Sequence, residues 1–94
     1  MGKPAKQPAR LKHAGHTAWR KVADEAVILD LDTANYYSLA GPGLRVWELL
    51  GEGRAPAAVC AALAEEFDAP PGRIAEDVGE LVAALKKEGL LEPA

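Results

Sequence analysis

Residues 27–50, VILDLDTANYYSLAGPGLRVWELL, constrain the fold most, because the spacing of their apolar residues changes partway along the segment. Val27, Leu29 and Leu31 alternate with their neighbours in the two-residue period of a β-strand. After Gly-Pro-Gly at 41–43, apolar residues recur three and four positions apart, which is the spacing of an amphipathic helix. The sequence therefore predicts an α+β domain in which a sheet leads directly into a helix.

A three-stranded antiparallel meander is predicted before this break. TAWRKV, AVILDLD and NYYSL supply the three strands, and Asp24-Glu25 and residues 32–35 supply the two turns. The last strand turns Tyr37 and Leu39 to one face of the sheet and Tyr36 and Ser38 to the opposite face.

Three helices are predicted after the sheet. The first contains LRVWELL, and the second begins near Pro56 and contains AAVCAALAEEF. The third runs from about Arg73 to Glu88, and its apolar stripe consists of Ile74, Val78, Leu81, Val82 and Leu85. A three-stranded antiparallel sheet with three helices after it is the element set of a winged helix-turn-helix-like fold.

Charge divides the chain into two parts. Residues 1–22 contain six lysines and arginines and no acid, whereas all fourteen acids follow with only five bases. Residues 1–16 also lack apolar periodicity. We therefore predict a flexible basic N-terminal segment at 1–16, part of which could instead pack as an irregular strand, and one folded domain at 17–92, in keeping with the length of 94 residues.

An enzyme is not expected from this residue set. His13 and His16 are the only histidines and fall in the predicted flexible segment, while the acids fall in turns or on solvent-facing helix positions. No acid or cysteine stands near these histidines in the sequence, so no metal site is predicted, and no cofactor is expected. Cys60 is single and is expected to be a small buried residue.

The chain also lacks the sequence features of membrane or secreted proteins. No run approaches the ~20 apolar residues of a membrane span. The N-terminus carries positive charge without the apolar stretch of a secretory signal. We therefore expect a cytoplasmic protein without a membrane partner.

DNA binding is the alternative hypothesis for a winged-helix fold. The helix that would enter a groove begins with Arg73 but continues with Glu76, Asp77 and Glu80. Because a polyanion is repelled by these acids, nucleic acid is not the expected partner.

The NYYSL strand favours a different function. It is expected at an edge of the sheet, and it contains none of the lysines, prolines or charges that usually prevent an edge from pairing with another chain. An exposed edge beside an amphipathic helix can accept an extended peptide as a further strand. The backbone then provides affinity, and side-chain pockets provide specificity.

Five motifs in this order resemble the PqqD-like family: D-x-x-T-x-x-Y-Y-x-L, V-W-x-L-L after a glycine, A-A-L-A-E-E-F, A-E-D-V and a terminal G-L-L. The resemblance covers about Trp19 to Leu91. This family is the precursor-recognition element (RRE) of pathways that make ribosomally synthesised peptide natural products (RiPPs). The D-x-x-T-x-x-Y-Y version is most similar to the stand-alone leader-recognition proteins of lasso-peptide pathways.

The resemblance implies a non-catalytic adaptor with a winged-helix-like fold. Such proteins bind the leader of a precursor peptide as an added strand between the third strand and the third helix, and present it to a maturation enzyme. A leader peptidase is the expected enzyme, and a radical enzyme or a cyclase is the second choice. Asp77 is expected to meet a basic leader residue, and the apolar positions an apolar or aromatic one. The peptide-binding residues implied are Asn35, Tyr36, Tyr37, Ser38, Leu39, Ile74, Asp77, Val78, Leu81, Val82 and Leu85.

Overall fold

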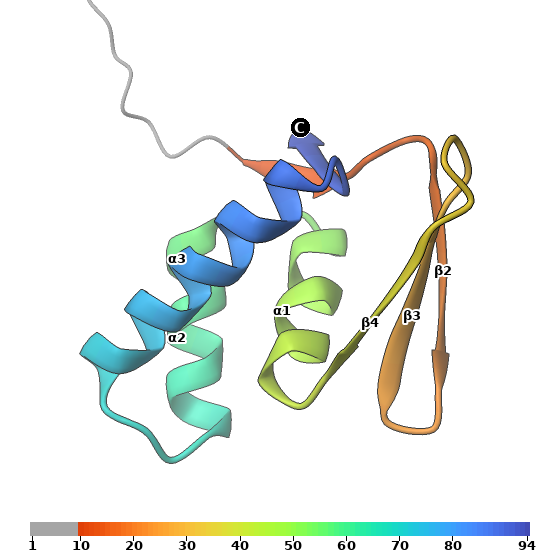
Figure 1. The fold of residues 1–94 in the computed structure, drawn as a ribbon. Helices are drawn as coiled ribbons and strands as arrows, with labels where there is room; N and C mark the ends of the chain where they lie inside the picture. The colour runs from red at the N-terminus through yellow and green to blue at the C-terminus, as the bar shows by residue number, and fades with distance from the viewer. Residues whose placement is uncertain (1–9) are drawn as a thin grey trace, which may run out of the picture.

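A computed structural model describes residues 10–94 of the chain. The elements in chain order are β1 (Leu11–His13), β2 (Thr17–Val22), β3 (Glu25–Asp30), β4 (Tyr36–Ala40), α1 (Pro42–Gly51), α2 (Pro56–Glu66), α3 (Pro71–Lys87) and β5 (Leu91–Pro93). Figure 1 shows the sheet on one side and the three helices on the other. The predicted meander followed by three helices is confirmed.

The main sheet has the order β2-β3-β4, and both pairs are antiparallel. Alternation in β3 directs Ala26 and Ile28 towards the helices, and neither side chain is exposed to solvent. The register places Trp19 and Tyr37 on either side of Ile28, so they share this inner face. The strands therefore form a layer that packs on the helices with one face only.

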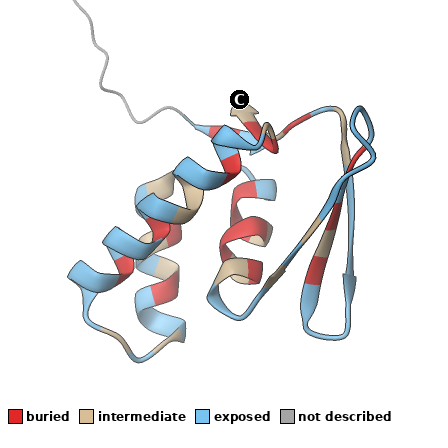
Figure 2. Ribbon diagram, viewed as in Figure 1, coloured by how far each residue is buried: buried red, intermediate tan, exposed pale blue. Residues whose placement is uncertain are grey.

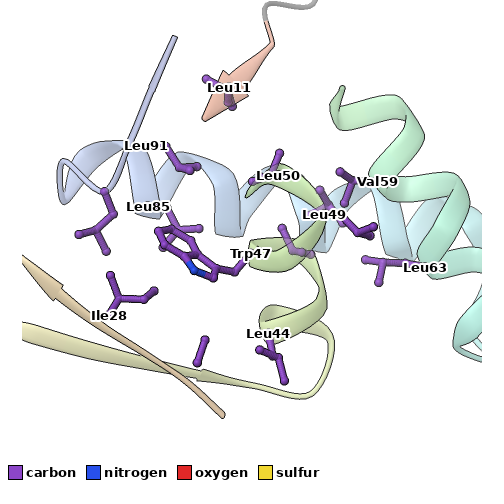
Figure 3. Close-up of a cluster of buried hydrophobic side chains, with 14 of the residues drawn as sticks. Leu11, Ile28, Leu44, Trp47, Leu49, Leu50, Val59, Leu63, Leu85 and Leu91 are labelled. Carbon is purple, nitrogen blue, oxygen red and sulfur yellow. The ribbon is translucent and has the colours of Figure 1, made fainter. Parts of the chain in front are cut away.

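Helix α1 is the centre of the hydrophobic core. It lies between the sheet and the pair formed by α2 and α3, and Figure 2 shows its buried residues as a nearly continuous band. Trp47, Leu49 and Leu50 are completely buried. In the close-up of Figure 3, the Trp47 ring extends from α1 towards Ile28 of the sheet and Leu85 of α3. One helix thus joins both layers of the domain.

Proline and glycine mark the ends of the helices as their backbone preferences require. Each helix has a proline in its first turn, where the missing N–H has no helical partner to lose. Helix α3 is followed by Glu88 as its C-cap and then by Gly89, whose φ of 78° suits glycine. Leu90 N–H then bonds to the Leu85 carbonyl, and Gly89 N–H to that of Lys86, which is the Schellman arrangement. This reversal brings the completely buried Leu90 back onto the core.

For the part of residues 1–16 that the structure describes, the prediction of flexibility is wrong and the alternative of a packed strand is confirmed. Residues 1–9 of the predicted flexible segment lie outside that part, but Leu11–His13 form β1 and pair antiparallel with β5. Leu11 and Ala14 are buried, with 5% and 3% of their surface exposed. This strand could not be recognised from the sequence, because it is only three residues long and its single apolar residue stands between charged ones. Its partner strand also lies far away in the sequence, at residues 91–93.

His13 is also held in place, although it was predicted in a flexible segment. Its ring stacks on Trp47 with centroids 3.6 Å apart and planes 7° from parallel. The ring Nε2 donates to the Trp47 carbonyl oxygen at 2.9 Å. A Cβ at Gly51 would lie 2.6 Å from the His13 ring, so only glycine leaves room for this stack. His13 therefore fastens the N-terminal segment to α1.

No helix in residues 10–94 combines the length and the apolar composition needed to cross a membrane.

Candidate functional site

Strand β4 is an edge of the main sheet, because within the described chain it pairs only with β3. None of its five residues is charged. Tyr36 is 74% exposed, whereas Tyr37 and Leu39 turn towards the helices and are half-buried. The outer edge of β4 is thus open for pairing and carries none of the usual obstacles.

A buried carboxylate fixes the turn that leads into β4. Asp30 is 4% exposed, and its Oδ1 accepts hydrogen bonds from the backbone amides of Asp32 at 2.9 Å and Thr33 at 3.2 Å. The Thr33 hydroxyl accepts from the Asn35 amide at 3.2 Å. Both side chains hold their own backbone in the turn, as these residue types commonly do. The aspartate and threonine of the D-x-x-T pattern therefore set where β4 begins, and Asn35 closes the turn rather than extending the strand.

Helix α3 runs beside the inner side of β4. A Cβ placed at Gly43 would lie 3.7 Å from Cδ2 of both Leu39 and Leu81, so both side chains lie against Gly43 at the start of α1. Nearer the other end of β4, the Tyr37 hydroxyl donates to Glu88 Oε1 at 3.2 Å. We call the space along these residues the β4–α3 groove, defined by Tyr37, Leu39, Leu81 and Glu88.

A cavity of about 190 Å³ opens at the Leu81 end of this groove. All three helices and the α2–α3 connection contribute to it. Its lining is Pro42, Gly43, Val46, Leu63, Phe67, Ala69, Ile74, Asp77, Val78 and Leu81. Asp77 is the only ionisable residue in this lining, and its carboxylate is bonded to the Arg73 guanidinium at 3.2 Å on the exposed side of α3. The cavity is therefore apolar with one acid at its mouth.

The structure brings some of the predicted residues together and separates others. Leu39, Asp77 and Leu81 lie at the cavity or its entrance, and Ile74 and Val78 form buried walls of it. Leu85 packs in the hydrophobic core with 5% exposure, and Val82 packs half-buried against that core without lining the cavity. The apolar stripe of α3 thus mainly holds the helix in place, because one stripe must cover α1 as well as face the groove.

Glu88 and Phe67 were missed as groove and cavity residues. Glu88 was read as the end of the helix, although it follows Leu81 by seven positions and so lies on the same face. Phe67 is predicted within the second helix, whereas it is the residue directly after α2. It lies four positions after Leu63, which lines the same cavity, so helical spacing was the signal that could have found it.

Partial burial and the Glu88 carboxylate both raise the pKa of the Tyr37 hydroxyl above its usual value of 10.0. The group therefore remains a protonated hydrogen-bond donor at neutral pH. Its bond to Glu88 joins the sheet to the end of α3 without adding a charge to the groove.

His16 lies closer to acids than the sequence indicated. Its Nε2 is 3.8 Å from Asp30 Oδ2, and one ligand atom from each of His16, Asp30 and Asp32 lies within 4.8 Å of the other two. Asp30 Oδ1 is already used by two backbone amides, and three ligands are one short of a closed tetrahedral site. We assign this cluster to the stability of the turn and place no metal there.

The fold and the groove together define a winged-helix-like domain with one open sheet edge and an apolar cavity beside it. The chain belongs to the PqqD family, because the family model described as coenzyme PQQ synthesis protein D (PqqD) matches residues 25–91. The resemblance predicted from the sequence is confirmed. The search of curated proteins gave no match.

Two solved structures share this fold. TbiB1 in complex with the TbiA(β) leader peptide is 31% identical, with a TM-score of 0.83 over 86% of this chain and 94% of that one. A lasso peptide synthetase B1 complexed with the leader peptide is 24% identical, with a TM-score of 0.83 over 90% of this chain and 100% of that one. The second likeness supports the fold alone, and both confirm the predicted fold class.

Proposed function

We propose that this protein is a non-catalytic adaptor that binds the leader of a ribosomally synthesised precursor peptide, of the lasso type, as an added strand on β4. The observation that carries the proposal is the uncharged open edge of β4 beside the apolar cavity. It is supported by the 31% identical TbiB1, whose solved structure is a complex with a leader peptide.

In this proposal the backbone edge of β4 and the apolar cavity contribute differently to leader binding. The free backbone groups of β4 pair with the leader backbone and provide affinity that does not depend on the leader sequence. The cavity receives one apolar or aromatic leader side chain between Leu81 and Phe67, while Asp77 favours a basic residue next to it. Because a flexible leader loses conformational entropy on binding, this anchor is needed for micromolar or tighter affinity.

DNA binding finds little support in the geometry. The exposed residues of the first half of α3 include Glu76, Asp77 and Glu80, and the guanidinium of Arg73 is bonded to Asp77. A phosphate backbone approaching this helix would meet mainly negative charge. The same surface is compatible with a peptide that carries a basic residue.

The adaptor delivers the bound precursor to a maturation enzyme in this proposal, with a leader-cleaving peptidase first and a radical enzyme or a cyclase second. We assign no catalytic residue to the chain itself. His13 is stacked on Trp47, and His16 faces the turn carboxylate Asp30, so both histidines have structural roles.

The test is a titration followed by fluorescence anisotropy, with a labelled leader from the precursor gene next to this protein's gene. Saturable binding at micromolar or lower concentration is expected. Leu81→Ala should weaken it about tenfold, or about 1.4 kcal/mol, because a cavity contact is lost. Val82→Ala is the matched control, since Val82 is half-buried on the same helix but does not line the cavity.

Two controls accompany the titration. Binding of a random DNA duplex is measured in the same way, and urea unfolding measures the stability of each variant. Both variants should stay folded, so that a loss of affinity reports on the site. Salt-sensitive binding of the duplex without leader binding would replace this proposal by the winged-helix regulator. If Leu81→Ala and Val82→Ala weakened leader binding equally, the anchoring side chain of the leader would not bind in the cavity.

A further inference from the structure

The face of the sheet turned away from the helices carries exposed apolar side chains. Strand pairing groups its residues into three rows across β2, β3 and β4. The rows, which we call the outer face, are Ala18–Leu29–Tyr36, Arg20–Val27–Ser38 and Val22–Glu25–Ala40. Val22 is 50% exposed, Leu29 38% and Tyr36 74%.

Nothing in residues 10–94 covers this face, because α1, α2 and α3 all lie on the other side of the sheet (Figure 1). Three of the five exposed large hydrophobic residues of the described chain belong to it, the others being Trp19 and Leu31. Leu29 and Tyr36 are paired neighbours, so this apolar surface is in part continuous and not only a set of singly exposed residues, as a contact site requires.

The outer face is continuous with the proposed peptide strand. Side chains alternate along a strand, so a leader paired with β4 directs half of its side chains into the groove and half to the outer face. These outward side chains would extend the rows of Tyr36 and Ser38 by one position. A protein that touches this face can therefore distinguish the loaded adaptor from the empty one.

The size of the face argues for a transient partner rather than a second copy of the chain. Three strands about 4.8 Å apart and about five residues of 3.3 Å each give roughly 240 Å². Stable interfaces bury about 800 Å² on each partner and use about 20–30 residues a side. The nine residues of the outer face fall well below this, whereas brief encounters use smaller areas.

Charge gives the partner a further property. Among residues 10–94 no acid lies within ion-pair distance of Arg20, although the whole chain has a net charge of −3. The neighbouring Lys21 points to the opposite face and lies 3.7 Å from Glu48 of α1. Arg20 is therefore free to meet a carboxylate of another protein.

We propose that the outer face is the docking surface for the enzyme that processes the bound peptide. The enzyme supplies apolar side chains over Leu29 and Val22 and a carboxylate to Arg20. This inference rests on the proposed leader binding and adds the place where the second protein is received.

The test reconstitutes leader cleavage from the full-length adaptor, its precursor and the purified leader-cleaving enzyme of the same pathway. Arg20→Glu is compared with Arg54→Glu, which makes the same charge change at an exposed residue whose partner is Glu52. Arg20→Glu should lower the cleavage rate about tenfold, because it repels the enzyme's carboxylate during association. Its leader affinity, measured by anisotropy, should stay within about twofold of the unchanged protein.

The possible outcomes separate this inference from the function on which it rests. Normal leader binding with undiminished cleavage by both Arg20→Glu and Val22→Asp would overturn the docking surface alone. A dimer in sedimentation that Arg20→Glu dissociates would assign the face to a second copy and overturn it as well. If the unchanged protein binds no leader, the proposed function fails, and the docking surface fails with it.

Discussion

The two edge strands of the main sheet, β2 and β4, differ in how readily they can pair with a strand of another chain. Strand β2 presents Arg20 and Lys21, and Lys21 is tied to Glu48 of α1 at 3.7 Å. Strand β4 presents no charge and borders the β4–α3 groove. Both strands pair only with β3 in the described chain, but positive charges on an edge oppose pairing with another strand, so β4 is the edge better suited to accept one.

The same two sides also differ in what lies behind them. Behind β2, Trp19 meets Trp47 edge-to-face with ring centroids 6.3 Å apart, and His13 is stacked on the same Trp47. Behind β4, Leu39 and Leu81 both lie beside Gly43, and Gly43 and Leu81 belong to the lining of the apolar cavity. The two sides thus differ in chemistry, because the hollow of about 360 Å³ beside Trp19 is lined by Arg45, Glu48 and Glu52, whereas the cavity on the β4 side has Asp77 as its single ionisable residue.

Removing the aromatic support behind β2 should have the largest effect. Trp47→Ala takes away a completely buried ring and should lower the free energy of unfolding by about 3–5 kcal/mol. Trp47→Phe keeps a ring against His13 and removes an indole N–H that has no partner in the described chain, so it should cost much less. Urea unfolding measures both. Equal losses would show that the ring stack is not what stabilises this side.

Exchanging the charges of the two edges should have an intermediate effect. Arg20 and Ser38 occupy the same row, one on each edge, so they form a matched pair. Ser38→Arg makes β4 resemble β2 and should weaken leader binding several-fold, on the order of 1 kcal/mol. Arg20→Ser should leave leader affinity unchanged in the same anisotropy titration. The reverse result would place the leader on β2.

A change of pH should affect the stability of the β2 side and not that of the β4 side, and this is the smallest of the expected effects. Burial lowers the pKa of His13 below its usual 6.5, against the opposing effect of its hydrogen bond to the Trp47 carbonyl. Between these two pKa values the unfolded chain binds more protons than the folded one, so the free energy of unfolding falls as the pH drops below 6.5. The loss ends once the pH is below the pKa of the folded state.

Urea unfolding between about pH 5 and 8 tests this expectation. His13→Phe keeps an aromatic ring on Trp47 and should remove this part of the pH dependence. Tyr37, on the β4 side, has a raised pKa and should contribute nothing in this range. If the pH dependence of unfolding were unchanged in His13→Phe, groups other than His13 would be responsible for it.

Much of the fold could be predicted because its signals are local. The switch from alternating residues to helical spacing at Gly-Pro-Gly located β3, β4 and α1, and Pro56 marked the start of α2, whereas α3 begins at Pro71, two residues before the predicted Arg73. β1 and β5 could not be predicted in this way. Each has three residues, and Leu11 pairs with Pro93, so no local window contains the pattern.

The candidate site was predictable only in part, for a related reason. Helical spacing places Asp77, Leu81 and Glu88 along one side of α3, and the sequence contains that information. It does not say how far the stripe is rotated towards α1, which decides that Leu85 is buried in the core and Leu81 faces the cavity. Nor does it say that α2 packs with Leu63 and Phe67 towards α3, which is what brings both residues into the cavity lining.

The sequence by itself determined the order of the three sheet strands and three helices from β2 to α3, the absence of charge on β4 and the turn built by Asp30 and Thr33, since each depends on residues close together in the chain. The tertiary structure alone decided that His13 packs on Trp47, that β1 meets β5, and that three helices leave a cavity beside the open edge. Spacing sets which side chains share a face, whereas only the packing of whole elements sets what each face meets.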